Sequence, residues 1–318
     1  MYNLQSLIVI INGYFLLSCT YSIEYPYKST SNKIVINCIL YPDSIVNLSL
    51  SYPSNYPSEN DTFTIVNDAE VKFYENSNFI DILIFDYETN IYKLDFKPAV
   101  GNTYSISILL PGHEEVFAHT YIPDEFIFEA CYQPLMQNQY LNEIKSNLSS
   151  LQHDESYWIY FLSDDYVYYK DSVDDRTIYS PKSGPLISFI YSYDRIFDDF
   201  NSLFWKDGSQ QYANVLRLPH LGYDFYSYSV YSTSSALWPN SDSISDFQKN
   251  RFKMIVVKAS KEADLYWKSV FLNHANKNFS IPNPFYEPVI VPSNIVNGTG
   301  VFAGVNSKFS YAFNNPCD

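Results

Sequence analysis

The chain has 318 residues, of which 35 are acidic and 20 basic, so that its formal net charge is −15. A protein this acidic repels a phosphate backbone, which excludes nucleic acid as a partner. With about 150 residues per domain as a prior, the length predicts two domains that each bury a core. Thirty-one tyrosines and 23 phenylalanines against nine glycines favour short strands over long amphipathic helices, so the expected class is mainly β.

The N-terminus has the features of a secretory signal. The apolar runs Leu7–Ile11 and Tyr14–Leu17 fall short of the about 20 residues of a membrane-spanning helix, and they fit a signal peptide core of roughly 7–15. They end in Leu16-Leu17-Ser18-Cys19, which resembles the lipobox of bacterial lipoproteins. We predict a signal peptide over 1–18, lipidation of Cys19 and a tether over 19–24. An ordinary cleaved signal with a chance cysteine is the alternative.

Residues 25–124 are predicted to form an immunoglobulin-like or transthyretin-like β-sandwich. Runs of strand length and apolar character are separated there by segments rich in Asn, Ser, Gly and Pro, which favour turns. The predicted strands are Lys33–Leu40, Val46–Tyr52, Ala69–Tyr74, Asp81–Phe85, Tyr92–Phe96, Tyr104–Leu110 and Val116–Ile122.

Residues 125–318 are predicted to form a second β-rich domain. The polar composition from Gln133 to Ser156 predicts a connector or an exposed excursion. Further strands are predicted at Tyr157–Leu162, Tyr166–Tyr169, Leu186–Tyr191, Ala213–Leu218, Tyr226–Val230 and Phe252–Ala259. Apolar residues at helical spacing then predict one helix near 261–275, with Ser260 as its cap.

The C-terminal segment is predicted to be extended and docked. Four prolines between residues 282 and 292 exclude a regular helix there. Val301 and Phe302 are expected to begin a strand that completes the sheet of the second domain.

The cysteines allow at most one disulfide after lipidation, because Cys38, Cys131 and Cys317 are an odd number. Cys38 shares its strand parity with Ile36 and Leu40, which predicts a buried thiol. If a bridge forms, Cys131 and Cys317 are the candidate pair.

A set of segments, taken in order behind the lipobox, resembles a known family. They are Val66–Tyr74, Gly101–Ile106, Ala118–Pro123, Tyr266–Ser269, Asn283–Pro288 and Ser293–Gly304. Together they resemble the Bacteroidota lipoproteins known as domain of unknown function 4249, and the segment that begins at Ser293 is the most specific. Members are often encoded beside TonB-dependent outer-membrane receptors. The resemblance therefore implies an accessory lipoprotein of the outer membrane with such a receptor as partner, on either the surface or the periplasmic face. It implies no catalytic residue.

Two motifs resemble sites of known chemistry without meeting their geometry. His113 and His119 are six residues apart, some 20 Å along a strand, which is too far for one zinc ion. Gly298–Gly304 has one residue too many for a dinucleotide fingerprint, so we interpret it as a tight turn that enters a strand. No metal and no cofactor is predicted.

Acidic residues recur between residues 164 and 246. They are Asp164, Asp165, Asp171, Asp174, Asp175, Asp194, Asp198, Asp199, Asp242 and Asp246. Solvated loops are the preferred interpretation, and a calcium site near Asn240–Asp246 is the alternative.

Tyrosines concentrate in three segments, Tyr157–Phe161, Tyr166–Tyr169 and Tyr223–Tyr231. We interpret them as the outer faces of strands, and a surface for protein or sugar recognition is the alternative. No catalytic motif is present, so we expect a non-enzymatic binding or accessory protein whose ligand the sequence does not name. The alternatives are a glycan- or peptide-acting hydrolase with an acidic pair in 160–250, and an adhesin or envelope-structural protein.

Overall fold

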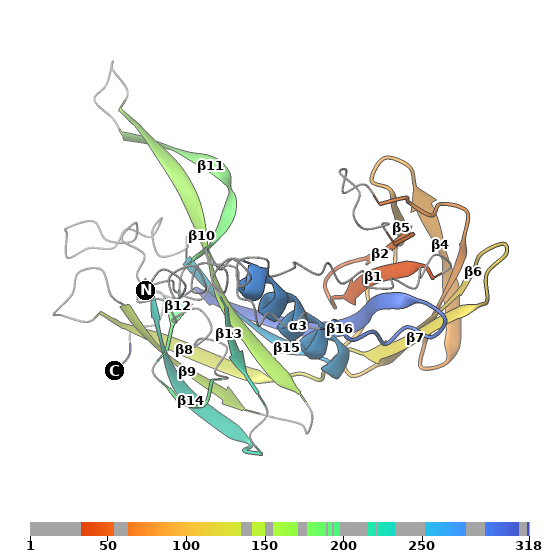
Figure 1. Cartoon of the computed structure of the whole chain (residues 1–318). Helices are drawn as coiled ribbons and strands as arrows, with labels where there is room; N and C mark the ends of the chain where they lie inside the picture. Colours follow the sequence, from red (N-terminus) through yellow and green to blue (C-terminus); the bar gives the residue numbers. More distant parts are fainter. Residues whose placement is uncertain are drawn as a thin grey trace, which may run out of the picture. The chain divides into compact units, whose positions relative to one another are not determined.

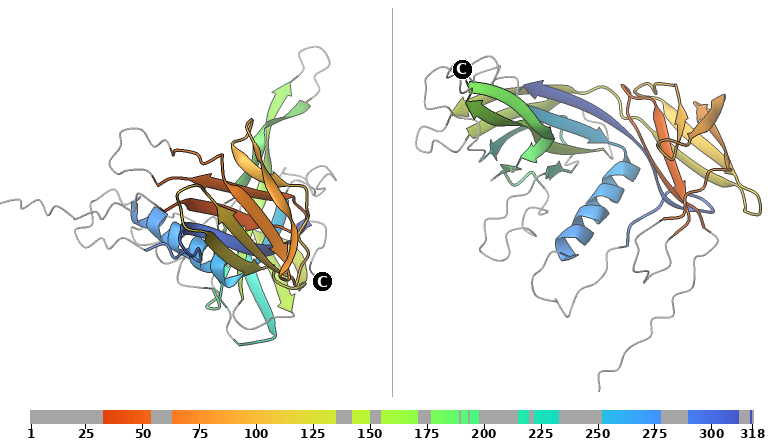
Figure 2. Two further views of the ribbon diagram at one scale, coloured as in Figure 1. Left: turned by 90° about the vertical axis from the view of Figure 1, so that its right-hand side faces the viewer. Right: turned by 90° about the horizontal axis from the view of Figure 1, so that it is seen from above.

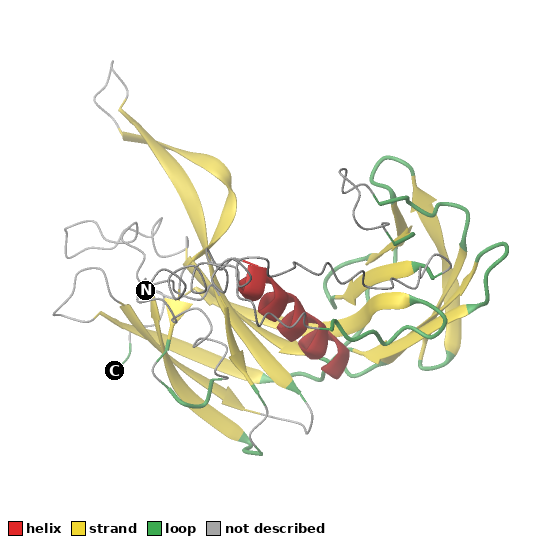
Figure 3. Ribbon diagram, in the orientation of Figure 1, coloured by secondary structure: helices red, strands yellow, loops and turns green. Residues whose placement is uncertain are grey.

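The computed structural model describes residues 33–53, 63–134, 142–149, 155–170, 177–188, 190–192, 194–197, 215–219, 222–232, 252–277, 290–311 and 317. Within this part the chain is mainly β, with helix α3 (Lys261–Lys277) near the C-terminus, which confirms the predicted class (Figures 1 and 3). Twelve strands belong to one sheet, eleven of them on one path of paired neighbours with β13 beside β10, and four strands form a separate sheet. No helix in the described part is long and apolar enough to cross a membrane.

The N-terminal sandwich consists of the first seven strands, at the positions that the sequence predicts. They are β1 (Val35–Leu40), β2 (Val46–Ser51), β3 (Glu70–Glu75), β4 (Asn78–Asp86), β5 (Ile91–Leu94), β6 (Thr103–Leu109) and β7 (Val116–Tyr121). They pair in the order β1-β2-β5-β4-β3-β6-β7. Because side chains alternate along a strand, Ile36, Cys38 and Leu40 of β1 all point into one core. Cys38 is a free, buried thiol as predicted, and burial raises its pKa.

The C-terminal sandwich packs two sheets against each other. One contains β10 (Ser156–Lys170), β11 (Thr177–Ser188), β13 (Val215–Leu218) and β15 (Phe252–Ala259), and the other is the four-stranded sheet of β8 (Ile127–Pro134), β9 (Asn142–Ser149), β14 (Phe225–Ser232) and β12 (Ile190–Tyr191). Side chains of both sheets, such as Ile159 and Leu148, share one core. The two sheets therefore form two layers around a shared core.

The prediction of a connector over Gln133–Ser156 is wrong for its middle part. Asn142–Ser149 is strand β9, which pairs with β8 on one side and with β14 on the other. Ile144 and Leu148 are fully buried, whereas the side chain of Lys145 is exposed. A period of two places alternate residues on opposite faces, so a strand that is polar in composition still contributes to a core.

Strand β16 (Thr299–Tyr311) belongs to both sandwiches. Its first half pairs in parallel with β1, where Thr299 is opposite Val35 and Gly304 is opposite Leu40. Its second half pairs antiparallel with β15, from Val305 to Tyr311. The expectation that this strand would complete the second sheet is thus correct only for the second half.

Helix α3 follows β15 directly and packs beside β16 (Figure 2). The side-chain oxygen of Ser260 accepts a hydrogen bond from the Ala263 amide (3.3 Å), which confirms the predicted N-cap. Ala263 and the ring of Phe271 cover Trp158 on the outer face of β10. The helix therefore shields the side of the sheet that faces away from the four-stranded sheet.

Candidate functional site

The segment before β16 closes the N-terminal sandwich. Val296 and Phe117 of β7 exchange two backbone hydrogen bonds (2.8 and 3.3 Å). The amide of Asn294 imitates a backbone group, because its oxygen accepts from the Phe302 amide (3.1 Å) and its nitrogen donates to the Phe302 carbonyl (2.7 Å) and to the His119 carbonyl (3.1 Å). The Asn294 side chain and the two backbone hydrogen bonds of Val296 therefore attach the segment to β7.

Two glycines of β16 allow close backbone contact. Gly300 has a φ of 109°, and a Cβ there would overlap the carbonyl oxygen of Ile36. A Cβ on Gly304 would overlap the carbonyl oxygen of Tyr121. The glycines are required by packing, which agrees with the interpretation of Gly298–Gly304 as a turn that enters a strand.

Lys258 and Glu155 form an ion pair inside the C-terminal sandwich. Their side chains are 0% and 2% exposed, and Nζ lies 2.6 Å from Oε2. The same Nζ donates to the carbonyl of Asp124 (3.2 Å). Asn306 of β16 donates to the carbonyls of Pro123 and Asp124 (3.2 and 3.1 Å). Two buried side chains thus hold the connection between β7 and β8.

A second buried pair attaches helix α3 to its sheet. Arg217 donates from Nε and Nη2 to the two carboxylate oxygens of Asp264 (2.7 and 2.6 Å). The indole Nε1 of Trp158 donates to the same carboxylate (2.9 Å), and Ser156 accepts from Arg217 (3.2 Å). This bidentate geometry is the strong form of a charged hydrogen bond. The most deeply buried charges of the described residues therefore hold the fold together.

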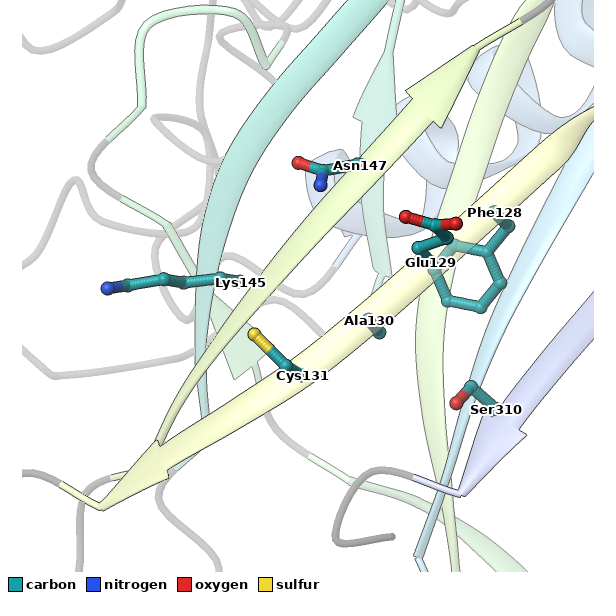
Figure 4. A pocket seen from close by; sticks show the side chains of 7 residues that line it. All are labelled: Phe128, Glu129, Ala130, Cys131, Lys145, Asn147 and Ser310. Carbon is teal, nitrogen blue, oxygen red and sulfur yellow. The ribbon is translucent and has the colours of Figure 1, made fainter. Parts of the chain in front are cut away.

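A groove of about 420 Å³ runs along β8 and is a candidate site. Its lining comes from three strands and combines apolar, charged and amide side chains (Figure 4). The residues are Phe128, Glu129, Ala130 and Cys131 of β8, Lys145 and Asn147 of β9, and Ser310 of β16. The volume lies in the range of about 300–1,000 Å³ that small-molecule sites occupy.

The position of β8 explains why the groove is open. β8 is the last strand of its sheet and pairs only with β9 in the described part of the chain. Phe128 packs against the core, whereas Glu129 is exposed on the opposite face. An open strand edge presents unpaired backbone groups that accept a further strand. The groove therefore combines an edge strand of the described sheet, whose Cys131 is bonded to Cys317, with charges of both signs.

A second cavity, of about 380 Å³, lies where the first turn of α3 meets β6 and β7, and a smaller one of about 150 Å³ lies between the start of α3 and the segment that leads into β16. Glu262 lines both, and its Oε2 accepts a hydrogen bond from Thr120 of β7 (3.2 Å). The larger cavity is rich in hydroxyl groups, and the smaller is lined by Leu265, Pro292 and Val301 among others.

Comparison with known families identifies the chain. A family model described as "Domain of unknown function (DUF4249)" matches residues 20–309. The chain belongs to this family. No curated protein matches. Among solved structures, a putative membrane-anchored protein from Corynebacterium diphtheriae is similar over 71% of this chain and 54% of its own, with 13% identity and a TM-score of 0.20, a similarity too low to carry an argument.

The structure of this DUF4249 member corrects the interpretation of three tyrosines, while the side chains of Tyr166–Tyr169 lie outside the described residues. Tyr157, Tyr226 and Tyr228 are buried, and they point into the core of the C-terminal sandwich rather than from the outer faces of strands. Burial is the main cause that raises the pKa of Tyr157 and Tyr228. Their rings fill the space between two sheets, whereas Tyr223 remains exposed.

The disulfide of this DUF4249 member joins Cys131 and Cys317, the predicted candidate pair. Cys19, the predicted lipidation site, lies outside the described residues. His113 lies in the turn before β7, where its ring is 5.9 Å from that of Tyr52, and His119 lies in β7, opposite Ser105 of β6. The described residues contain no group of three or more metal-ligating side chains.

The acidic residues between 164 and 246 fall mostly outside what the structure describes. Asp164 and Asp165 lie in strand β10 rather than in a loop, and Asp194 accepts a hydrogen bond from the Ser229 amide (2.6 Å) and so fixes a loop to β14. The proposed calcium segment near Asn240–Asp246 is outside the described residues.

Sequence reasoning missed the groove beside β8, because no strand was predicted at Ile127–Pro134 and the polar segment that contains β9 was interpreted as a connector. The alternation of Ile144, Ser146 and Leu148 with charged and amide residues was the signal that could have found β9.

Proposed function

We propose that this protein is a non-enzymatic lipoprotein of the outer membrane that binds a TonB-dependent receptor or the ligand of that receptor. The groove beside β8 is the observation that carries this proposal. It combines an open strand edge with Glu129, Lys145 and Asn147, which is the chemistry by which one protein adds a strand to the sheet of another. The buried charged residues of the C-terminal sandwich support the non-enzymatic part of this proposal, since they form ion pairs with one another that stabilise the fold.

Lipid on Cys19 would place this groove within reach of a receptor in the same membrane. Thirteen residues, 20–32, separate Cys19 from Lys33, where the described structure begins. Fully extended, they span about 45 Å at roughly 3.5 Å per residue. Such a reach allows the folded part to approach a membrane protein from several directions.

Replacement of the lipidated cysteine tests the anchor. We expect Cys19→Ala to leave the protein in the soluble fraction, because acyl chains are the proposed attachment to the membrane. The measurement is fractionation with a carbonate wash, with Cys38→Ala, a change at a buried thiol, as the control. Retention of the Cys19→Ala protein in the washed membranes would contradict the anchor.

Charge reversal in the groove tests receptor binding. The tagged chain is extracted in mild detergent and co-purified proteins are identified. We expect an outer-membrane receptor to accompany the wild type, and Glu129→Lys combined with Lys145→Glu to lower its recovery at least about fivefold, since charge pairs at an interface set specificity.

The control for this experiment is Asp81→Lys, an exposed change on β4 that should leave receptor recovery unchanged. Repeated purification of the wild type without any receptor or ligand would remove the basis of the proposal. Equal recovery with the groove variant would show that binding occurs elsewhere.

A further inference from the structure

The cavity between β6, β7 and helix α3 has a mostly polar lining, in which Tyr104 and Thr120 are buried and their hydroxyl groups bond to other protein groups. Its volume is about 380 Å³, and its side chains come from a turn, two strands and the first turn of a helix. They are Ser77, Thr103, Tyr104, Ser105, His119, Thr120, Tyr121 and Glu262. Thr103 is opposite Tyr121 and Ser105 is opposite His119, whereas Tyr104 is opposite Thr120, and these two point to the other face and are 1% and 2% exposed. Residues directly opposite on antiparallel strands share one face of the sheet.

Two aromatic rings lie beside this polar lining. Tyr74 of β3 is opposite Ser105 on one side and opposite Phe79 of β4 on the other. The rings of Tyr74 and Phe79 meet edge to face, with centroids 5.7 Å apart, and Phe79 is 53% exposed. Four neighbouring strands therefore carry a row of side chains that changes from apolar rings to hydrogen-bonding groups. The row consists of Phe79, Tyr74, Ser105 and His119.

The lining distinguishes between classes of ligand. Its one carboxylate, Glu262, and the absence of Lys and Arg among its residues disfavour a phosphate or another anion. Hydroxyl groups, a carboxylate and an imidazole donate and accept hydrogen bonds at once, which suits a ligand that carries many hydroxyl groups of its own. The exposed ring of Phe79 beside them suits the C–H face of a pyranose ring, because the face of an aromatic ring carries partial negative charge.

We infer that this cavity, with the Tyr74–Phe79 aromatic pair at its side, binds a neutral oligosaccharide. Phe79 stacks on one sugar ring, while Ser105, His119 and Glu262 bind hydroxyl groups of the next. This inference deepens the proposed function and rests on it, since it names the class of ligand that a membrane-tethered binding protein would hold.

Titration of the lipidated mature chain with oligosaccharides tests the inference. The chain is purified in lauryldimethylamine oxide, a detergent without a sugar headgroup. Maltohexaose, cellohexaose, laminarihexaose and xylohexaose are titrated by calorimetry and by saturation-transfer NMR. We expect saturable binding of at least one of them, and about a tenfold loss of affinity in Phe79→Ala and in His119→Ala.

Ile84→Ala is the matched control, because Ile84 is 76% exposed on the same strand as Phe79 but pairs toward β5. It should bind like the wild type, and thermal melts should show that all variants are folded. Absence of saturable binding to every hexaose overturns the inference, and so does undiminished binding in Phe79→Ala and His119→Ala. If those variants instead lose a co-purified receptor, the surface is a protein contact and the oligosaccharide inference is wrong, while the proposed function stands.

Discussion

The two sandwiches of this chain fill their interiors with different chemistry. The described core of the N-terminal sandwich consists of aliphatic and aromatic side chains and one thiol, Cys38. The C-terminal sandwich also buries charged side chains, since Glu155, Arg217, Lys258 and Asp264 are all at most 8% exposed. An apolar core stabilises by burial alone, whereas buried ions require a partner in the correct place. Among the described residues, one sandwich thus has an apolar core and the other also buries charged side chains. The ion pairs of the second sandwich lie where elements from distant parts of the sequence meet.

Strand β16 connects the two sandwiches. It pairs with β1 of the apolar sandwich and with β15 of the sandwich that contains the ion pairs. Its Asn306 also holds the connection between β7 and β8 through two carbonyl groups. We therefore expect a defect in this strand to affect both sandwiches, and a defect in an ion pair to affect mainly one.

The largest effect is expected from removal of the shared strand. Deletion of 293–318 should abolish the cooperative thermal unfolding of the intact protein, because β1 and β15 both lose a neighbouring strand and the closure by Asn294 is lost. The effect should greatly exceed the roughly 0.5 kcal/mol of a typical surface change. A melt of the truncated protein that matches the intact one would show that the segment is a peripheral tail.

A smaller effect, confined to the C-terminal sandwich, is expected from breaking its ion pair. Lys258→Met should lower the free energy of unfolding by about 3–5 kcal/mol, because it leaves Glu155 buried without its cation. The double variant Lys258→Met with Glu155→Leu should be less damaging than the single one, since it leaves no uncompensated charge. Urea denaturation compares the three proteins, and a double variant that is worse than Lys258→Met would refute this view of the pair.

The smallest loss of stability is expected from a change where β16 pairs with β1. Gly300→Ala should cost about 1–3 kcal/mol, since it combines a positive φ with overlap against the Ile36 carbonyl. Gly112→Ala is the control, because Gly112 has a φ of 79° but open space around it. The difference between the two variants in thermal melts measures the backbone contact itself. Equal destabilisation by both would mean that φ alone matters and that the contact with β1 is relaxed.

Local patterns in the sequence predicted much of the fold. Alternation of apolar and polar residues located β1 to β7, and it placed Cys38 in the core because its neighbours of the same parity are aliphatic. Ser260 followed by apolar residues at helical spacing located α3, since a cap and a helical period are both properties of a few adjacent residues. Composition, the alternation of apolar and polar residues and the capping residue thus predicted the class, the strands of the first sandwich and the start of the helix.

Tertiary structure decided what depends on residues far apart in the chain. Nothing near Lys258 shows that its partners are Glu155 and the Asp124 carbonyl, and nothing near Thr299 shows that β16 divides its pairing between β1 and β15. The hydroxyl-lined cavity likewise assembles Ser77, Ser105, His119 and Glu262 from four separate segments. A periodic sequence fixes which side of a strand is apolar, but the free energy that selects its neighbour comes from packing and hydrogen bonds that form only when distant strands meet.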